Sequence, residues 1–127
     1  METLKMNVYG KEQEIVLPVK KMVGTVFYGS DRYVVVCTNV YSNKKCSIVI
    51  LYGIGENNYK EYVKTDKDGI EYLKDEFYDK FMNEYEIEKI NYSLRKNGVW
   101  YPIGNPIQSG CGGIRFGYAM PYQDPSF

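Results

Sequence analysis

The best local candidate for chemistry in this sequence is a glycine-rich run that ends at an arginine, residues 109–115, Ser-Gly-Cys-Gly-Gly-Ile-Arg. Closely spaced glycines let the backbone approach a ligand, and consecutive N–H groups can surround an anion. Arg115 could then close on a phosphate or carboxylate with its forked guanidinium. We therefore predict a ligand site that includes Gly110, Gly112, Gly113 and Arg115. A tight structural loop is the alternative, because the run lacks the Gly-Lys-Ser/Thr of a P-loop.

Arginine is rare in this chain, in which most basic residues are lysine and only Arg32, Arg95 and Arg115 are arginines. A guanidinium is a planar, permanently charged donor that matches a phosphate or carboxylate with two parallel hydrogen bonds. An arginine that lies in a cleft would therefore be a selective anion ligand. We add Arg32 and Arg95 to the predicted site.

The absence of histidine excludes the commonest catalytic designs. Neither a Ser-His-Asp triad, nor a Cys-His pair, nor a His-ligated metal can be built without an imidazole. The three cysteines have no paired spacing for zinc, and Cys37 and Cys46 lie in apolar runs where reduced cysteine packs as a small hydrophobe. Cys111 has polar neighbours and could be reactive. We predict no metal, no cofactor and no enzymatic activity.

The acidic residues have ordinary structural explanations. Those at 84–88 alternate around an isoleucine near a strand start, and those at 66–68 stand where a helix is expected to begin. Carboxylates at a helix N-terminus accept hydrogen bonds from unpaired amides and favour the dipole. An enzyme that uses Asp/Glu, Tyr or Cys stays open as a third class of function.

Aromatic residues are unusually abundant, with 14 tyrosines, 5 phenylalanines and one tryptophan. Tyrosine offers rigid apolar area with a polar tip, which suits protein interfaces and stacked bases. It also serves as a core and strand residue. The composition therefore favours a binding protein and leaves two classes of partner, a small nucleotide-like anion or a host protein held by an exposed Tyr/Trp surface.

Length and charge predict one domain. The chain has 127 residues, 44% of them hydrophobic, and Lys+Arg equals Asp+Glu, so no overall basic field for nucleic acid exists. The apolar runs are too short for a membrane-spanning helix, and the N-terminus does not resemble a signal peptide. We expect a cytoplasmic protein with a single α+β domain at 1–120 and an extended arm at 121–127.

The first half of the sequence predicts strands. Alternating residues at 3–8, a turn at Gly10 and the run Glu-Ile-Val-Leu at 14–17 indicate a first hairpin. Residues 22–28 and 32–40, separated by Gly-Ser-Asp at 29–31, indicate a second one. The run 46–52 is apolar at nearly every position, which is typical of a central strand.

The second half predicts one helix and a return to strands. Asp68 and Glu71 resemble a capping box, and Ile70, Leu73, Phe77, Phe81 and Tyr85 recur at helical spacing, so we expect a helix at about 68–85 with those five side chains on the sheet. Asn-Gly at 97–98 indicates a hairpin between strands at 87–94 and 99–101. A last strand is expected at 114–120. The fold class is α+β, a mainly antiparallel sheet of about five to seven strands with one helical segment packed on it.

This order of elements resembles the small phage proteins that sequester cyclic ADP-ribose-type signals of the Thoeris defence system. The resemblance places Phe81 near the helix end and Asn91 on the next strand at positions that hold a base, and Arg115 near the phosphates. It implies a non-catalytic, homo-oligomeric nucleotide sponge, a viral anti-defence protein that acts in the cytoplasm of a low-GC bacterial host.

Overall fold

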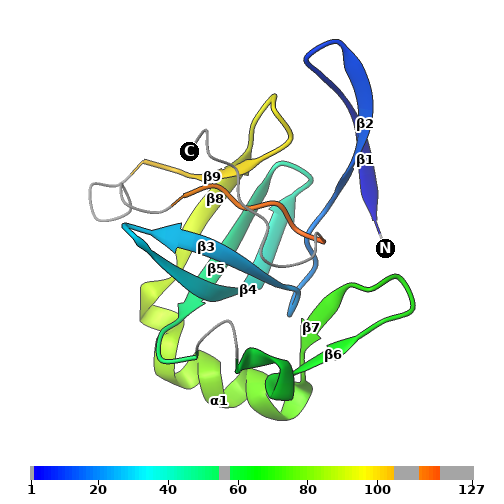
Figure 1. Cartoon of the computed structure of the whole chain (residues 1–127). Coiled ribbons are helices and arrows are strands. Elements are labelled where there is room, and N and C mark those ends of the chain that lie inside the picture. Colours follow the sequence, from blue (N-terminus) through cyan, green and yellow to red (C-terminus); the bar gives the residue numbers. More distant parts are fainter. Residues whose placement is uncertain (1, 55–57, 105–111, 118–127) are drawn as a thin grey trace.

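The computed structural model describes residues 2–54, 58–104 and 112–117, and it confirms the α+β class (Figure 1). A five-stranded antiparallel sheet has the order β3-β4-β5-β8-β9, and two hairpins, β1-β2 and β6-β7, form separate two-stranded sheets. The strands are β1 (Thr3–Val8), β2 (Lys11–Val16), β3 (Val23–Tyr28), β4 (Asp31–Ser42), β5 (Lys45–Leu51), β6 (Val63–Thr65), β7 (Glu71–Leu73), β8 (Ile90–Leu94) and β9 (Trp100–Pro102). The helical elements are α1 (Asp75–Tyr85) and two short 3₁₀ helices, η1 (Tyr59–Tyr62) and η2 (Glu86–Glu88).

The predicted hairpins are confirmed. Val8 pairs with Lys11 across a two-residue turn in which Tyr9 and Gly10 both have positive φ, 50° and 83°. Tyr28 pairs with Asp31 across Gly29 and Ser30, with a φ of 63° at the glycine. Positive φ at such positions matches the twist of the flanking strands, which is why glycine marks them in the sequence. The predicted arm at 121–127 lies outside the described residues.

Strand β5 lies at the centre of the sheet, as its unbroken apolar run predicted, and all its residues after Lys45 are buried. Alternate side chains of β4 enter two cores: Val35 and Cys37 face the concave side of the curled sheet, whereas Val34 and Val36 face α1. Figure 1 shows α1 at the end of the molecule opposite the β1-β2 hairpin. The helix therefore covers only part of the outer surface of the sheet.

The curled sheet is closed by the short segment 112–114. Ile114 forms a bridge with Trp100, with N–O distances of 2.8 and 2.9 Å, and the Gly112 N–H donates to the Phe27 carbonyl at 2.7 Å. The segment thus joins β9 to β3, the two edge strands. The strand predicted at 114–120 is wrong over its described part, because Ile114 makes only this bridge and the chain then turns at Gly117, with a φ of 79°. Residues 118–120 lie outside the described residues.

The first part of the predicted helix is wrong. Residues 63–73 form the β6-β7 hairpin, and α1 begins only at Asp75. Asp66 Oδ1 accepts hydrogen bonds from the amides of Asp68 and Ile70 at 2.9 and 3.0 Å, and Gly69 has a φ of 82°. This local turn competes successfully with the helix, as short acidic side chains followed by glycine often do. Ile70, just before β7, and Leu73, within β7, are buried, whereas Phe77, Phe81 and Tyr85 belong to α1.

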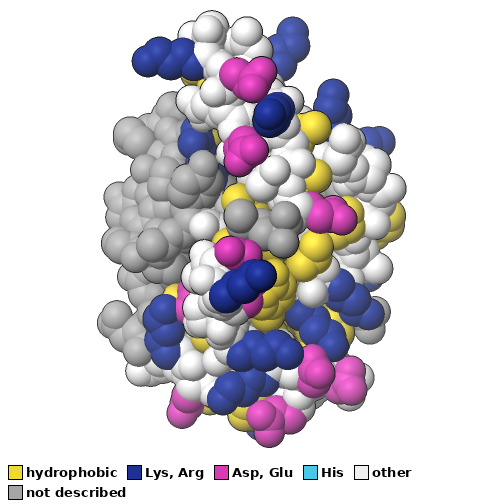
Figure 2. All heavy atoms as spheres, turned by 90° about the vertical axis from the view of Figure 1, so that its right-hand side faces the viewer, with side chains coloured by type: hydrophobic (Ala, Val, Ile, Leu, Met, Phe, Trp, Pro, Cys, Tyr) yellow, Lys and Arg dark blue, Asp and Glu magenta, His cyan; other side chains and the backbone are white. Residues whose placement is uncertain are grey.

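The surface carries no dominant charge on the side that faces the viewer in Figure 2, where basic and acidic side chains are mixed. This mixture agrees with the zero net charge of the chain. Among the described residues, no helix has the length and apolar character needed to cross a membrane, and no group of three or more acidic or cysteine side chains is placed to hold a metal ion.

Gly113→Ala should destabilise the protein by about 1–3 kcal/mol, because a Cβ at this position would lie only 2.6 Å from Val99 Cγ1 and 3.1 Å from Tyr101 Cε1. Gly104→Ala is the matched control, since a Cβ there meets no atom within 4 Å. Chemical denaturation of the two variants measures the difference. Equal stabilities would contradict the role of Gly113 in closing the sheet.

Candidate functional site

The outer surface of β8, β9 and the segment 112–117 forms an open face that α1 leaves uncovered. Tyr92, Leu94 and Trp100 point into the concave core, so their neighbours Ser93 and Tyr101 point outward. Among the described residues, the core beneath α1 includes none from β8 or β9. The exposed or half-buried residues of this open face are Asn91 and Ser93 from β8, Tyr101 and Ile103 at β9, Arg115 from the closing segment, and Lys45 from neighbouring β5. Ser47 of β5 and Gly113 lie between them and are buried.

Two of the three arginines meet at the edge of the open face, around the loop that joins β8 to β9. The Arg95 guanidinium lies 5.0 Å from the centre of the Tyr101 ring, and Arg115 Nη2 donates to the Asn97 carbonyl at 3.4 Å. Asn97 Nδ2 donates to the Tyr101 hydroxyl at 3.0 Å, while Asn97 Oδ1 accepts from the Val99 amide at 3.1 Å. A single asparagine therefore fixes the loop, the ring and the half-buried Arg115 in one arrangement.

The sequence around this loop is basic, although the whole chain is neutral. Residues 89–120 contain four basic side chains and no aspartate or glutamate. These basic residues are Lys89, Arg95, Lys96 and Arg115. Lys45 stands directly opposite Ser93 and adds a further positive charge to the same face. A surface of one sign attracts a ligand of the opposite sign and raises its local concentration.

Asn91 lies on the open face, two residues before Ser93. Its Oδ1 accepts from the Ser47 hydroxyl at 2.7 Å, and that hydroxyl is 3.0 Å from the hydroxyl of exposed Tyr41. The Asn91 carbonyl accepts from the Ile103 amide at 2.8 Å. The Asn91 amide group is thus held in a defined orientation, with its nitrogen available on an exposed residue.

The described part of the glycine-rich run is structural. The amides of Gly112 and Ile114 donate to the carbonyls of Phe27 and Trp100, so neither points at a ligand. Gly113 lies against Val99 and Tyr101, where a side chain would not fit. Gly110, together with Ser109 and Cys111, lies outside the described residues. Residues 112–114 therefore do not form the predicted anion nest. Arg115, in contrast, reaches the open face.

Phe81 lies apart from this cluster, and Arg32 stands on the other side of the closing segment, on the strand next to β3. Phe81 is only 5% exposed and packs on Phe77 and Tyr62, with ring centres 6.0 and 5.3 Å away, in the core beneath α1. Arg32 lies at the β3-β4 turn with its guanidinium 4.7 Å from the centre of the Phe27 ring. Of the eight predicted site residues, the structure brings Asn91, Arg95, Gly113 and Arg115 to the open face, with Gly112 at its border.

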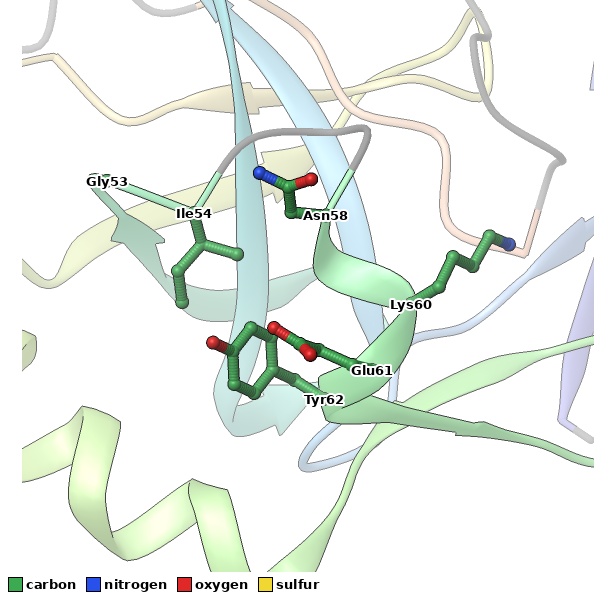
Figure 3. A pocket seen from close by; sticks show the side chains of 6 residues that line it. All are labelled: Gly53, Ile54, Asn58, Lys60, Glu61 and Tyr62. Carbon is green, nitrogen blue, oxygen red and sulfur yellow. The ribbon is translucent and has the colours of Figure 1, made fainter.

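A separate hollow of about 400 Å³ lies beside η1 (Figure 3). Ile54, Glu61 and Tyr62 line it together with Gly53, Asn58 and Lys60. The Lys60 side chain points away from the other five in Figure 3, and its Nζ is 2.5 Å from Glu71 Oε2. Burial and a hydrogen bond to the Glu71 carboxylate raise the pKa of the neighbouring Tyr59 hydroxyl. The remaining charged side chain of the lining is acidic, so the hollow does not favour an anion.

The structure also separates core tyrosines from surface tyrosines, which composition alone did not allow. Tyr59, Tyr78 and Tyr92 are buried, whereas Tyr9 and Tyr41 are exposed. Trp100 is fully buried, so it is not part of an exposed aromatic surface. Tyr101 and Asn97 were missed as site residues. The Asn-Gly turn could have indicated them, because a tight hairpin at this position brings both strand ends to one loop.

Comparisons with protein-family models, with curated proteins and with solved structures found no match for this chain. The site is therefore interpreted from its own geometry and charge.

Asn97→Ala should lower the free energy of unfolding by roughly 1 kcal/mol, because it removes the hydrogen bonds to the Val99 amide and the Tyr101 hydroxyl. Asn83→Ala, at an exposed position of α1, should leave stability unchanged or raise it slightly. Urea denaturation of both variants checks this difference. A stable Asn97→Ala protein would show that the loop is held by other contacts.

Proposed function

We propose that the protein binds a small anionic, nucleotide-like ligand on the open face and does not transform it. One observation carries the proposal: Arg95 and Arg115, two of only three arginines, converge on the β8-β9 loop beside Tyr101. They do so within a stretch of sequence that lacks acidic residues. A phosphate-bearing ligand matches this arrangement better than a neutral or cationic one does.

Each side chain has a distinct role in this proposal. Arg95 is exposed but stacks on Tyr101, which reduces the conformational freedom that it would lose when it binds a phosphate. Arg115 is half-buried, so it is partly desolvated before the ligand arrives. Asn91 and Ser93 lie on β8, next to Tyr101 of β9, and offer polar groups suited to the uncharged parts of the ligand. The absence of histidine makes binding without turnover the simpler function.

Sequestration of a nucleotide signal, as in a phage anti-defence sponge, is the form of binding that the resemblance to such proteins suggests. A second candidate is the inhibition of a host protein. It is supported by Tyr41 and Ile103, which are 60% and 42% exposed and flank Asn91 on the open face. Exposed apolar side chains beside a polar group are common where proteins dock.

Thermal-shift measurements with inorganic phosphate, pyrophosphate, ADP-ribose and cyclic nucleotides test the proposal. A ligand that binds the folded state raises the melting temperature in proportion to the logarithm of its concentration once it exceeds Kd. We expect at least one phosphate compound to stabilise the wild-type protein. Arg95→Ala and Arg115→Ala should each weaken that stabilisation, by roughly tenfold or more in Kd for the loss of a charged hydrogen bond.

Arg32→Ala is the matched control, because it removes the same charge from the β3-β4 turn and should leave binding within about twofold. The proposal fails if no phosphate compound shifts the wild-type protein, or if Arg32→Ala weakens binding as much as the other two variants do. Stoichiometric capture of a host protein that Tyr41→Ala abolishes, with no response to any phosphate compound, would establish the second candidate instead.

A further inference from the structure

The β1-β2 hairpin forms a ribbon whose strands have no third partner among the described residues (Figure 1). Its apolar side packs on the rest of the chain at one end, where Val8 and Ile15 are buried against Gly98. On the opposite side of the ribbon, Val16 lies against Gly117. Leu4 and Met6, further from the turn, are only partly buried. The ribbon therefore presents two strand edges and an incompletely covered apolar row.

The geometry of the turn determines which backbone groups lie on these edges. Val8 and Lys11 flank a two-residue turn, so they form a hydrogen-bonded pair. Hydrogen-bonded pairs alternate along the ribbon, and the N–H and C=O groups of Thr3, Lys5 and Asn7 consequently point away from β2. The same alternation directs the backbone groups of Glu12 and Glu14 outward from β2.

The two edges differ in charge. Two copies could also pair antiparallel through β2, with their apolar sides on the same face. The pairing would then use the outward backbone groups of Glu12 and Glu14. Every such register centred between residues 12 and 14 places a glutamate of one copy opposite a glutamate of the other. Like charges directly opposite each other destabilise a strand pair. The β2 edge is therefore protected against self-pairing, as sheet edges commonly are.

We propose that a second copy of this chain pairs with the β1 edge, antiparallel and centred on Met6. In this register Met6 lies opposite Met6 of the second copy, and Leu4 lies opposite Val8 of the second copy, so the apolar row continues across the junction. Lys5 lies opposite Asn7 of the second copy and the two lysines do not face each other. In the neighbouring register, centred on Lys5, the Lys5 side chains of the two copies would lie directly opposite each other, which is unfavourable.

Tyr9 supports this register. It is 89% exposed at the tip of the ribbon and has a φ of 50°, a conformation in which asparagine and glycine are the usual residues. Within its own chain the ring has almost no packing. In the paired ribbon Tyr9 stands opposite Thr3 of the second copy, where the ring gains a neighbour. Two β1-β2 hairpins joined in this way make a four-stranded sheet, and a sheet of three or more strands with an apolar face can be stable by itself.

The proposal concerns the ribbon alone and does not depend on the ligand of the open face. Sedimentation velocity over a range of protein concentrations tests it, with Lys5→Pro as the variant. Proline removes an N–H that points outward from β1 and leaves the hydrogen bonds between β1 and β2 in place. We expect the wild-type protein to form a dimer and Lys5→Pro to remain monomeric at the same concentrations.

Glu14→Pro is the matched control, because Glu14 is directly opposite Lys5 and its N–H points to the other edge. It should dimerise like the wild-type protein. A wild-type protein that stays monomeric at every concentration overturns the proposal, as does a dimer that Lys5→Pro leaves intact.

Cross-linking provides a second readout if proline unfolds the ribbon. In a Cys111→Ser background, Met6→Cys should form a disulfide between two copies when treated with oxidised glutathione, which accepts the two electrons and the two protons of the thiols as it is reduced. Paired cysteines opposite each other at a non-hydrogen-bonded position approach closely enough for this bond. Gln13→Cys, opposite Met6 on β2, should not cross-link. Equal cross-linking of both variants contradicts pairing through β1.

Discussion

The closure of the curled sheet by residues 112–114 is the constraint on which the rest of the structure depends. Its hydrogen bonds to Trp100 and Phe27 join the two edge strands, and they are possible because Gly113 lets the backbone lie directly against β9. Without this segment β3 and β9 would be open edges, and the concave core that contains Trp100 and Ile114 would be exposed on one side. The same segment carries Arg115 to the loop at which Arg95 is held.

Closure also explains how a neutral chain acquires a basic surface. Most of the acidic residues lie in the stretch 56–88, which contains α1 and its neighbours in the sequence, whereas 89–120 has none. Since β8, β9 and the closing segment are neighbours, Arg95 and Arg115 of this stretch meet at one loop. Among the described residues, the core beneath the helix contains none from β8 or β9, so the helix packs on the other part of the sheet. The proposed binding of an anion therefore depends on the arrangement of the strands and does not require a net charge on the protein.

Much of the fold could be predicted from the sequence because short-range signals dominate it. Gly10, Gly29 and Gly98 marked three hairpins, and the apolar run of β5 marked the central strand. The helix start could not be predicted from periodicity, because Ile70 and Leu73 have helical spacing from Phe77 and yet lie in the β6-β7 hairpin, Ile70 in its turn and Leu73 in β7. The Asp66 turn decides this region, and its signal, Asp-Gly at 68–69, was outweighed by an apparent capping box.

The candidate site was predictable only in part. The rarity of arginine singled out Arg95 and Arg115, but their meeting depends on the pairing of Trp100 with Ile114, a long-range contact without a local signal. Phe81 was placed in a ligand site by topology alone, and its apolar surroundings under α1 give it a core role instead. Arg32 could not be separated from the other two arginines until the strand order was known.

The central claim, that the open face holds a phosphate-bearing small molecule, is tested most directly by mass spectrometry of the compounds that heat denaturation releases from the purified protein. Protein produced in cells that contain the ligand should release an ultraviolet-absorbing phosphate compound in near-stoichiometric amount, and the Arg95→Ala/Arg115→Ala double variant should release little of it. Equal release from the wild-type protein and the double variant, or none from a wild-type protein that also fails to bind any added phosphate compound, would contradict the account.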